Sequence, residues 1–187
     1  MTSAAILENS VVRQAVLPIT VDQYHRLGEA AILGADTELL RGVIVRKMVK
    51  SPLHTWIVAQ LFERLRELVP AVMHVRQEQP LTFSDSEPEP DLAVVRGTLN
   101  DYRLRHPSGS ELVIEVAIGS PELDRSKLEL YASAGVGEVW IVLAKEKTIE
   151  VYREPHDSAG YARVTRYVAS ERVPLPMADG RELSLDW

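Results

Sequence analysis

The sequence predicts a mixed α/β domain, of the α+β kind, in which helices pack against a central β-sheet. The order of predicted elements is helix, hairpin, helix, several strands, helix, several strands, which suits a sheet covered by helices. The 187 residues are enough for one hydrophobic core. No internal repeat or low-complexity linker divides them, so we expect residues 1–18 to form an N-terminal arm and residues 19–187 a single domain.

The first half of the chain carries three local signals. Thr20 and Gln23 match a capping box, and apolar residues follow at helical spacing. Two short apolar runs then flank Arg41 and Gly42, which predicts a β-hairpin. In SPLHTWIVAQLFERLRELVP, Ser51 precedes a proline at the first helical position and a second proline closes the segment, which predicts a long helix.

The second half is richer in predicted strands. VMHVRQ, PLTF, DLAVVR and ELVIEVAI are predicted strands, and the acidic, proline-rich SDSEPEP is a predicted loop. SPELDRSKLELYASAG predicts one helix with Ser120 as N-cap, Pro121 at the first position and Gly135 just beyond the end. EVWIVL, TIEVYRE and ARVTRYV follow as strands, and the polar loop PHDSAG separates the last two.

Composition excludes several classes of function. The absence of cysteine rules out disulfides, thiolate metal sites and cysteine nucleophiles, and it is compatible with a reducing compartment. No apolar stretch approaches the roughly 18 residues that span a membrane, and the first residues lack the pattern of a signal peptide, so we expect a cytoplasmic protein without a membrane partner. The net charge of -6 argues against tight non-specific binding of nucleic acid, but it allows a local basic groove or a metal-binding cluster of carboxylates.

Two charged residues stand where apolar residues are expected. Glu115 interrupts a strand that is otherwise apolar on both faces. An unpaired carboxylate there is strongly unfavourable, so Glu115 should pair, become protonated or bind a cation. Lys127 shares the apolar stripe of the following helix, whereas Asp124 is expected to point elsewhere. The lysine either extends to water or reaches a carboxylate on the sheet.

Asp91 adds a second carboxylate to this region. It opens an apolar strand directly after EPEP, where it is either a turn residue or a side chain that projects at the end of the strand. Two carboxylates beside a lysine suit a hard divalent cation, since Mg²⁺ prefers carboxylate oxygens, a carbonyl and water. The alternative is a purely structural ion pair between Glu115 and Lys127.

The order Asp91, Glu115, Lys127 resembles the PD-(D/E)xK restriction-endonuclease-like superfamily, and more closely its Uma-two branch, long filed as a domain of unknown function. The matching stretches are VDQYHRLGEAAILGADTELLRG, SEPEPDLAVVR, LVIEVA and DRSKLELYASAGVGEVWIV, and they lie between about Val21 and Glu154. The resemblance implies a restriction-endonuclease-like core, with a central mixed sheet flanked by helices and the site at one sheet edge.

The resemblance also implies a set of site residues. Asp91 and Glu115 hold Mg²⁺, for which Mn²⁺ can substitute, and the Val116 carbonyl is a further ligand. Lys127, on the following helix instead of two positions after the glutamate, orients or deprotonates the attacking water or stabilises negative charge. Glu38 adds a ligand for a second ion or a water. The implied protein is an endonuclease that cuts DNA phosphodiester bonds to leave a 5′-phosphate, with a homodimer as the expected assembly.

Departures from the family pattern keep other readings open. The hairpin contains RGV where the branch commonly has D-G-E, and the segment from Asp124 to Lys127 looks one residue shorter. The aspartate that often follows W-I-V is also missing. One alternative is a catalytically silent module that binds nucleic acid or protein, and another is the structural ion pair. Metal binding separates the nuclease from the structural pair, and cleavage separates it from the silent module.

Five further polar residues have local positions that allow either a role at the site or an ordinary surface position. His54, in the first turn of the long helix, is expected to be partly exposed, and Gln77 could line the site. Arg103, Arg105 and His106 form a small basic loop that either contacts phosphates or is a mobile polar loop.

Overall fold

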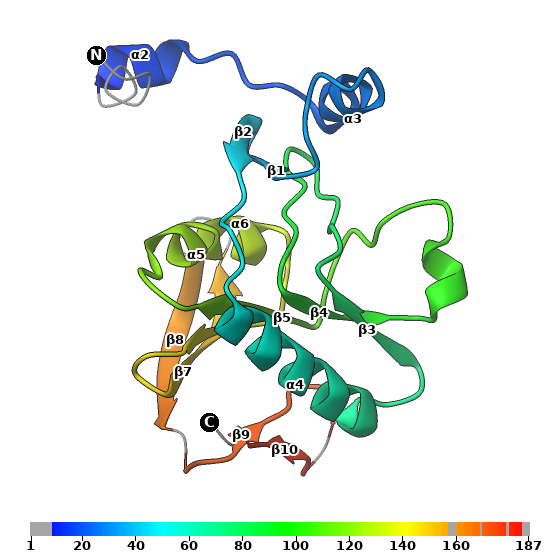
Figure 1. The fold of residues 1–187 in the computed structure, drawn as a ribbon, viewed down its shortest axis with the longest axis vertical. Helices are drawn as coiled ribbons and strands as arrows, with labels where there is room; N and C mark the ends of the chain where they lie inside the picture. The colour runs from blue at the N-terminus through cyan, green and yellow to red at the C-terminus, as the bar shows by residue number, and fades with distance from the viewer. Residues whose placement is uncertain (1–8, 157–159, 169, 179, 185–187) are drawn as a thin grey trace.

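A six-stranded sheet forms the centre of the molecule (Figure 1). The computed structural model describes residues 9–156, 160–168, 170–178 and 180–184. The strands lie in the order β3-β4-β5-β6-β7-β8. Their bounds are β3 (Met73–Gln77), β4 (Leu92–Arg96), β5 (Leu112–Ala117), β6 (Glu138–Leu143), β7 (Thr148–His156) and β8 (Gly160–Val168). Strands β5 and β6 are parallel and the other neighbours are antiparallel, so the predicted mixed sheet is confirmed.

Helices cover both faces of this sheet. The long helix α4 (Pro52–Leu68) places Ile57, Leu61 and Leu65 against one face, and its Ser51 cap and proline start are as predicted. The second face is covered by α6 (Leu128–Ser133), which contributes Leu130 and Tyr131 to a separate apolar cluster. Because β5 and β6 are buried along their whole length, their sequences are apolar on both sides apart from Glu115 and Glu138.

The N-terminal elements lie apart from the sheet (Figure 1). Helix α2 (Ser10–Ala15) is exposed apart from half-buried Val12, and it is a helical part of the predicted arm. Helix α3 (Val21–Glu29) begins with the predicted capping box, since the side chains of Thr20 and Gln23 each accept a backbone hydrogen bond from the other residue. Every residue of α3 is exposed or half-buried, so little burial holds this helix in place.

The predicted hairpin consists of β1 (Thr37–Leu40) and β2 (Val43–Arg46). Arg41 and Gly42 both have positive φ, at 49° and 76°, which suits a two-residue turn between twisted strands. Leu39 and Glu87 exchange backbone hydrogen bonds of 3.3 and 2.7 Å. The hairpin is therefore attached to the acidic loop and not to the main sheet.

The strand predicted for PLTF is wrong. These residues are extended but lie outside the sheet, because they bond to the loop that follows them. The Leu81 N–H donates to the Pro88 carbonyl at 2.9 Å, and the Phe83 N–H donates to the Ser86 carbonyl at 2.8 Å. Prolines at 80, 88 and 90 lack the N–H that a strand ladder requires, which favours this local fold.

The helix predicted from Ser120 to Gly135 is in fact two short helices. Helix α5 (Glu122–Ser126) ends at Lys127, and α6 begins immediately after it. The N-cap position of α5 is Pro121, so the predicted Ser120 cap is wrong. The Lys127 N–H donates to the Asp124 carbonyl, three residues earlier, which tightens the chain at the break. Gly135 lies beyond the end with φ at 74°, as predicted.

Three remaining segments complete the fold. A 3₁₀ turn, η1 (Leu99–Tyr102), follows β4, and a small pair, β9 (Val173–Pro174) and β10 (Glu182–Leu183), packs on the α4 side of the sheet. The middle of the loop predicted between β7 and β8 falls on residues 157–159, outside the described residues. Among the described residues, no helix has the length and apolar character needed to cross a membrane.

Candidate metal-binding active site

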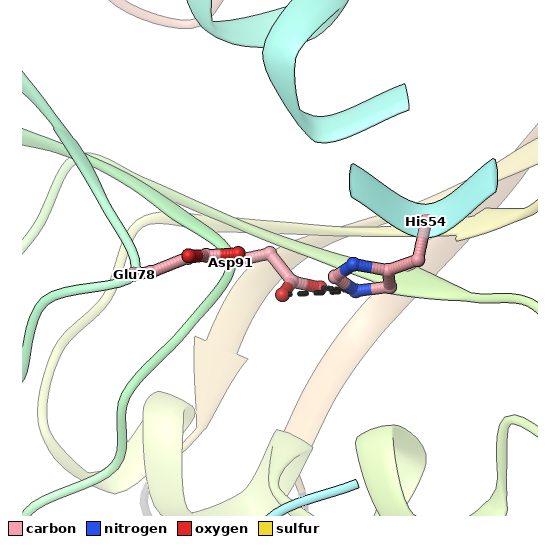
Figure 2. A group of neighbouring side chains, drawn as sticks. All are labelled: His54, Glu78 and Asp91. Carbon is pink, nitrogen blue, oxygen red and sulfur yellow. Dashed lines mark hydrogen bonds and ion pairs between the residues drawn. The ribbon is translucent and has the colours of Figure 1, made fainter. Parts of the chain in front are cut away.

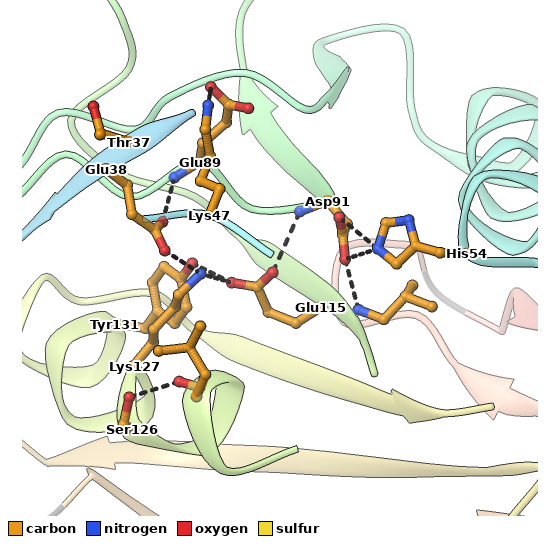
Figure 3. Close-up of polar contacts among 12 residues, drawn as sticks. Thr37, Glu38, Lys47, His54, Glu89, Asp91, Glu115, Ser126, Lys127 and Tyr131 are labelled. Atoms are coloured by element: carbon orange, nitrogen blue, oxygen red, sulfur yellow. Dashed lines mark hydrogen bonds and ion pairs between the residues drawn. The ribbon is translucent and has the colours of Figure 1, made fainter. Parts of the chain in front are cut away.

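A cavity of about 510 Å³ opens where the hairpin, the N-terminus of α4, the ends of β4 and β5 and the α5–α6 break converge. Asp91, Glu115, Lys127 and Glu38 all line it, together with Val116. Figure 3 shows the side chains of Glu38, Glu115 and Lys127 meeting from elements far apart in sequence, with Asp91 beside Glu115. The structure thus brings together the five residues that the family resemblance implied for the site.

Asp91 is held at the start of β4 by two neighbours. Its Oδ2 accepts the Val116 N–H at 2.7 Å, and His54 Nε2 lies 3.1 Å from the carboxylate (Figure 3). The hydrogen bond to Asp91 raises the pKa of His54, although burial acts in the opposite direction. A turn role alone does not explain this carboxylate, since it faces the cavity.

Glu115 is the most constrained carboxylate of the site. It is 3% exposed, and its Oε1 accepts from the Tyr131 hydroxyl at 2.7 Å and from Lys127 Nζ at 3.3 Å. Its Oε2 lies 3.4 Å from the Asp91 N–H. Burial is the main reason that the pKa of Glu115 is raised to about 8, and Lys127 opposes that rise. The carboxylate would gain from a second positive charge.

Lys127 reaches the carboxylates and does not extend to water. It is 5% exposed, and its Nζ lies 3.0 Å from Glu38 and 3.3 Å from Glu115. Burial lowers the pKa of Lys127, but the two carboxylates outweigh burial and raise it above the ordinary lysine value. The ion pair between Glu115 and Lys127 that the sequence analysis offered as an alternative is therefore present, and Glu38 joins it as a third member.

Glu38 comes to the site from the hairpin. It is 2% exposed on β1, and besides Lys127 it accepts the Glu89 N–H at 3.2 Å. Glu89 in turn pairs with Lys47 at 3.0 Å. The acidic loop and the hairpin therefore fix Glu38 jointly.

Two residues of the cavity were not recognised from the sequence. His54 is buried, and the expectation of a partly exposed side chain is wrong. Asp124 is half-buried at the cavity, and mainly because of burial its pKa is raised to about 6. It was expected to point elsewhere because a continuous helix was assumed, and the break at Lys127 changes its direction. Gln77 ends β3 and is not among the described residues that line the cavity.

The donor set fits a hard divalent cation. Three buried carboxyl groups, those of Asp91, Glu115 and Glu38, line the cavity together with one buried ammonium group, that of Lys127, so acidic groups outnumber ammonium groups among the buried side chains there. Each carboxylate has about four acceptor positions, and the hydrogen bonds described above leave some of them available. Carboxylate oxygens are the ligands that Mg²⁺ prefers.

A second donor set shares Asp91. One ligand atom each from His54, Glu78 and Asp91 lies within 4.8 Å of the others. Figure 2 shows Asp91 between Glu78 and His54. An ion could therefore contact Asp91 from the Glu115 side or from the Glu78 side, and Lys50 already pairs with Glu78 at 3.0 Å.

Comparison with known families decides the classification. The model of Uma2, described as "Putative restriction endonuclease", matches residues 21–186. The chain belongs to this family. The resemblance on which the sequence analysis relied is thereby confirmed, and a nuclease class of activity is the one that Uma2 membership indicates.

A solved structure supports the fold of this Uma2 protein. The chain is similar to a protein from Anabaena variabilis described as "a putative nuclease belonging to DUF820", with a TM-score of 0.72 and 20% identity. The match covers 89% of this chain and 95% of that one. At this identity it shows the shared fold alone. No curated protein matched the chain.

Proposed function

We propose that this protein is a metal-dependent endonuclease that hydrolyses phosphodiester bonds in DNA. The observation that carries the proposal is that three buried carboxyl groups and one buried lysine line the same open cavity. Family membership supports the reaction class. A structural ion pair needs only one carboxylate for each lysine, so the surplus carboxylates favour a site built for a cation.

We propose Mg²⁺ as the ion, with Mn²⁺ as a substitute, held by Asp91, Glu115 and the Val116 carbonyl. When bound, the ion polarises the scissile phosphate and lowers the pKa of an attacking water. The Val116 N–H and His54 orient the Asp91 carboxylate, so that it can bind a metal ion with little rearrangement. Tyr131 does the same for Glu115.

Lys127 would act on the reacting phosphate. Two carboxylates within 3.3 Å favour its ammonium form, so stabilising negative charge suits it better than accepting a proton. Glu38 positions this ammonium, and a role for Glu38 as ligand to a second ion or a water stays part of the proposal. Substrate DNA would enter from the open side of the cavity.

The proposal extends to assembly and location. A homodimer would let two sites act on two strands. Apolar side chains near the cavity mouth, Met48, Val49, Leu53 and Trp56, are exposed and offer area for a second copy. We also propose that the protein works in the cytoplasm, where a cysteine-free chain has no need of disulfides.

The first test is cleavage of supercoiled plasmid with Mg²⁺ or Mn²⁺. The wild type should nick or linearise the plasmid, and EDTA should stop it. Asp91→Asn and Glu115→Gln should each lower the rate at least about 100-fold, since each removes a ligand. Glu63→Gln, an exposed carboxylate change on α4, is the matched control and should be neutral. Cleavage that survives both site variants would overturn the proposed site.

A second test locates the ion beside Asp91. Isothermal calorimetry with Mn²⁺ compares Glu115→Gln with Glu78→Gln, which remove one carboxylate from either side. Loss of binding in Glu115→Gln alone supports the proposed ligands. Loss in Glu78→Gln alone assigns the ion to the His54 side.

The silent binding module is the second candidate, and the RGV hairpin favours it. Its outcome is distinct: metal and DNA would bind, but plasmid would stay intact with every metal tried.

A further inference from the structure

A second, larger cavity of about 980 Å³ lies beside the segment that follows β4. Its cationic or aromatic lining comes mainly from the basic loop: Arg103, Arg105, His106 and Tyr102, with His25 from α3. This cavity is distinct from the one that holds Asp91 and Glu115. The basic loop is therefore not part of the metal site itself.

Arg76 lies beneath this lining and is the unusual residue. It is 4% exposed, and its Nη2 lies 3.1 Å from His106 Nδ1 and 3.4 Å from the Pro80 carbonyl. Its guanidinium stands 5.6 Å from the ring of Tyr102. Within the described residues Arg76 has no carboxylate in ion-pair range, and its buried Nε has no hydrogen-bond partner. A buried, unpaired guanidinium is strongly unfavourable unless an anion meets it.

The neighbouring carboxylates are already engaged. Glu111 pairs with Arg96, and Glu87 accepts from His25 and from the Thr82 hydroxyl. Arg103 and Arg105 are exposed, and no ion-pair partner for them exists among the residues that the structure describes. The cavity is thus a local surplus of positive charge on a protein whose net charge is -6.

The acidic loop has residues at both cavities. Glu89 lines the metal site, and Glu87, two residues earlier, contacts His25 at the basic cavity. Arg76 and Glu115 lie on the same face of the sheet, since Arg76 pairs with Ala93 and Ala93 pairs with Val113. A polymer that contacts both cavities would therefore need to follow only one face of the sheet.

We propose that the Arg76 cavity binds a backbone phosphate of the DNA strand, outside the bond that is cut. The His106 ring lines the cavity and the Arg76 guanidinium lies directly behind it, so Arg76 adds positive charge beneath the phosphate while Arg103 and Arg105 contact it from the loop. The identity of the polymer rests on the proposed function, whereas the anion site rests on the buried guanidinium. Phosphate oxygens match a guanidinium in both charge and geometry.

The main experiment measures binding of a fluorescein-labelled DNA duplex by anisotropy in EDTA, where no cleavage occurs. Arg103→Gln with Arg105→Gln should weaken binding at least about tenfold and flatten the salt dependence by about two ions. The double variant Arg163→Gln with Arg172→Gln removes the same charge from exposed positions elsewhere and should change binding less than about twofold. Equal effects of the two double variants, or no DNA binding by the wild type, would overturn the proposal.

A second experiment tests the buried guanidinium directly. Sodium phosphate, compared with chloride at equal ionic strength, should raise the Tm of the wild type by about 2–4 °C at saturating concentration. Arg76→Gln should abolish this rise. If this variant does not fold, the exposed Arg103 and Arg105 variants still decide the question. A rise that is the same with and without Arg76 counts against the site.

Cleavage assays on the same variants separate this proposal from the nuclease. DNA binding that depends on the loop arginines without any cleavage would support the phosphate site and oppose the nuclease. DNA cleavage by the wild type, combined with DNA binding that is unchanged when those arginines are replaced, would support the nuclease and oppose the phosphate site.

Discussion

At the scale of single residues, the balance of buried charge in the site depends most on Lys127. It is the buried cation that two buried carboxylates share. Both carboxylates are almost fully shielded from solvent, so water does not stabilise their charge. Removing Lys127 leaves Glu38 and Glu115 facing each other in a site of low polarity. Such unpaired buried charges are the ones that destabilise proteins most.

We therefore expect Lys127→Met to lower the free energy of unfolding by about 3–5 kcal/mol in EDTA. Mn²⁺ should restore part of that loss, because a cation replaces the missing charge. Urea unfolding with and without metal measures both effects. Lys145→Met, an exposed change of the same kind, should be neutral. A loss of stability that is the same with and without Mn²⁺ would favour the structural ion pair.

The sequence could predict these residues because each one breaks a pattern. Glu115 interrupts an apolar strand and Lys127 an apolar stripe, and burial then leaves few options for either. His54 breaks no pattern, since a polar residue in the first turn of a helix is ordinary. Its contact with Asp91 exists only because the α4 N-terminus and the start of β4 meet in the fold.

At the scale of elements, the hairpin turn controls the position of Glu38. Gly42 has φ at 76°, and a Cβ there would lie 2.4 Å from Pro18 Cβ. Gly42→Ala should therefore lower the free energy of unfolding by about 1–3 kcal/mol and weaken Mn²⁺ binding by displacing β1. Gly28→Ala, with nothing within 4 Å of the new Cβ, is the matched control. Unchanged stability and metal affinity in Gly42→Ala would contradict this role.

Glu150 joins three elements and makes that junction sensitive to acid. Its buried carboxylate accepts from Arg125 of α5, Arg166 of β8 and Tyr152 of β7. Burial acts to raise the pKa of Glu150, but the hydrogen bonds from Arg166, Tyr152 and Arg125 outweigh it and lower the pKa below its ordinary 4.5. A carboxylate whose pKa is depressed on folding stabilises the folded state above about pH 4.5 and loses that effect as the pH falls below it.

Glu150→Gln should accordingly lower the free energy of unfolding by about 1–3 kcal/mol at pH 7. The difference from wild type should shrink steadily below about pH 4.5. Urea unfolding between pH 3 and pH 7 measures it, and Glu146→Gln, in an exposed turn, is the control. A difference that stays constant across this range would show that the ion pairs are not its source.

Elements with clear end signals were predicted well, and the errors have one physical cause. Capping residues and turn glycines act locally, so α3, α4 and the hairpin have the predicted starts and turns. PLTF and the α5–α6 break depend instead on hydrogen bonds to residues outside each segment. PLTF hydrogen-bonds to the proline-rich loop that follows it and so does not join the sheet. The hydrogen bond from Arg125 to Glu150 accompanies the break between α5 and α6.

At the scale of the whole molecule, the arm and the body contribute unequally to stability. We propose that residues 19–187 form the single domain, since α2 buries none of its own residues. Deleting residues 1–17 should change Tm by less than about 2 °C, because Ile19 keeps its 3.0 Å bond to the Gly42 carbonyl. Differential scanning calorimetry checks this. A fall of more than about 5 °C would make the arm part of the domain.

Fold class was predictable from pattern because apolar runs, caps and turns each act over a few residues. The sheet order and the single parallel pair, β5 with β6, are long-range facts that the pattern does not specify. The Uma-two resemblance implied a mixed sheet flanked by helices, which the family match and the shared fold confirm, but the strand order and the parallel pair come from the structure alone. The contacts of the site side chains depend on this order.

The break at Lys127 also bears on how the chain can accept new sequence. In one continuous helix, each residue inserted upstream would rotate the lysine by about 100° away from the carboxylates. Here α6 fixes Lys127 through its own buried residues, Leu130 and Tyr131, whereas Gly119 and Ser120 lie exposed ahead of α5. A reporter peptide spliced between Gly119 and Ser120 would therefore lengthen the connection without turning the lysine, and because both residues line the cavity it would place the probe at the mouth of the site.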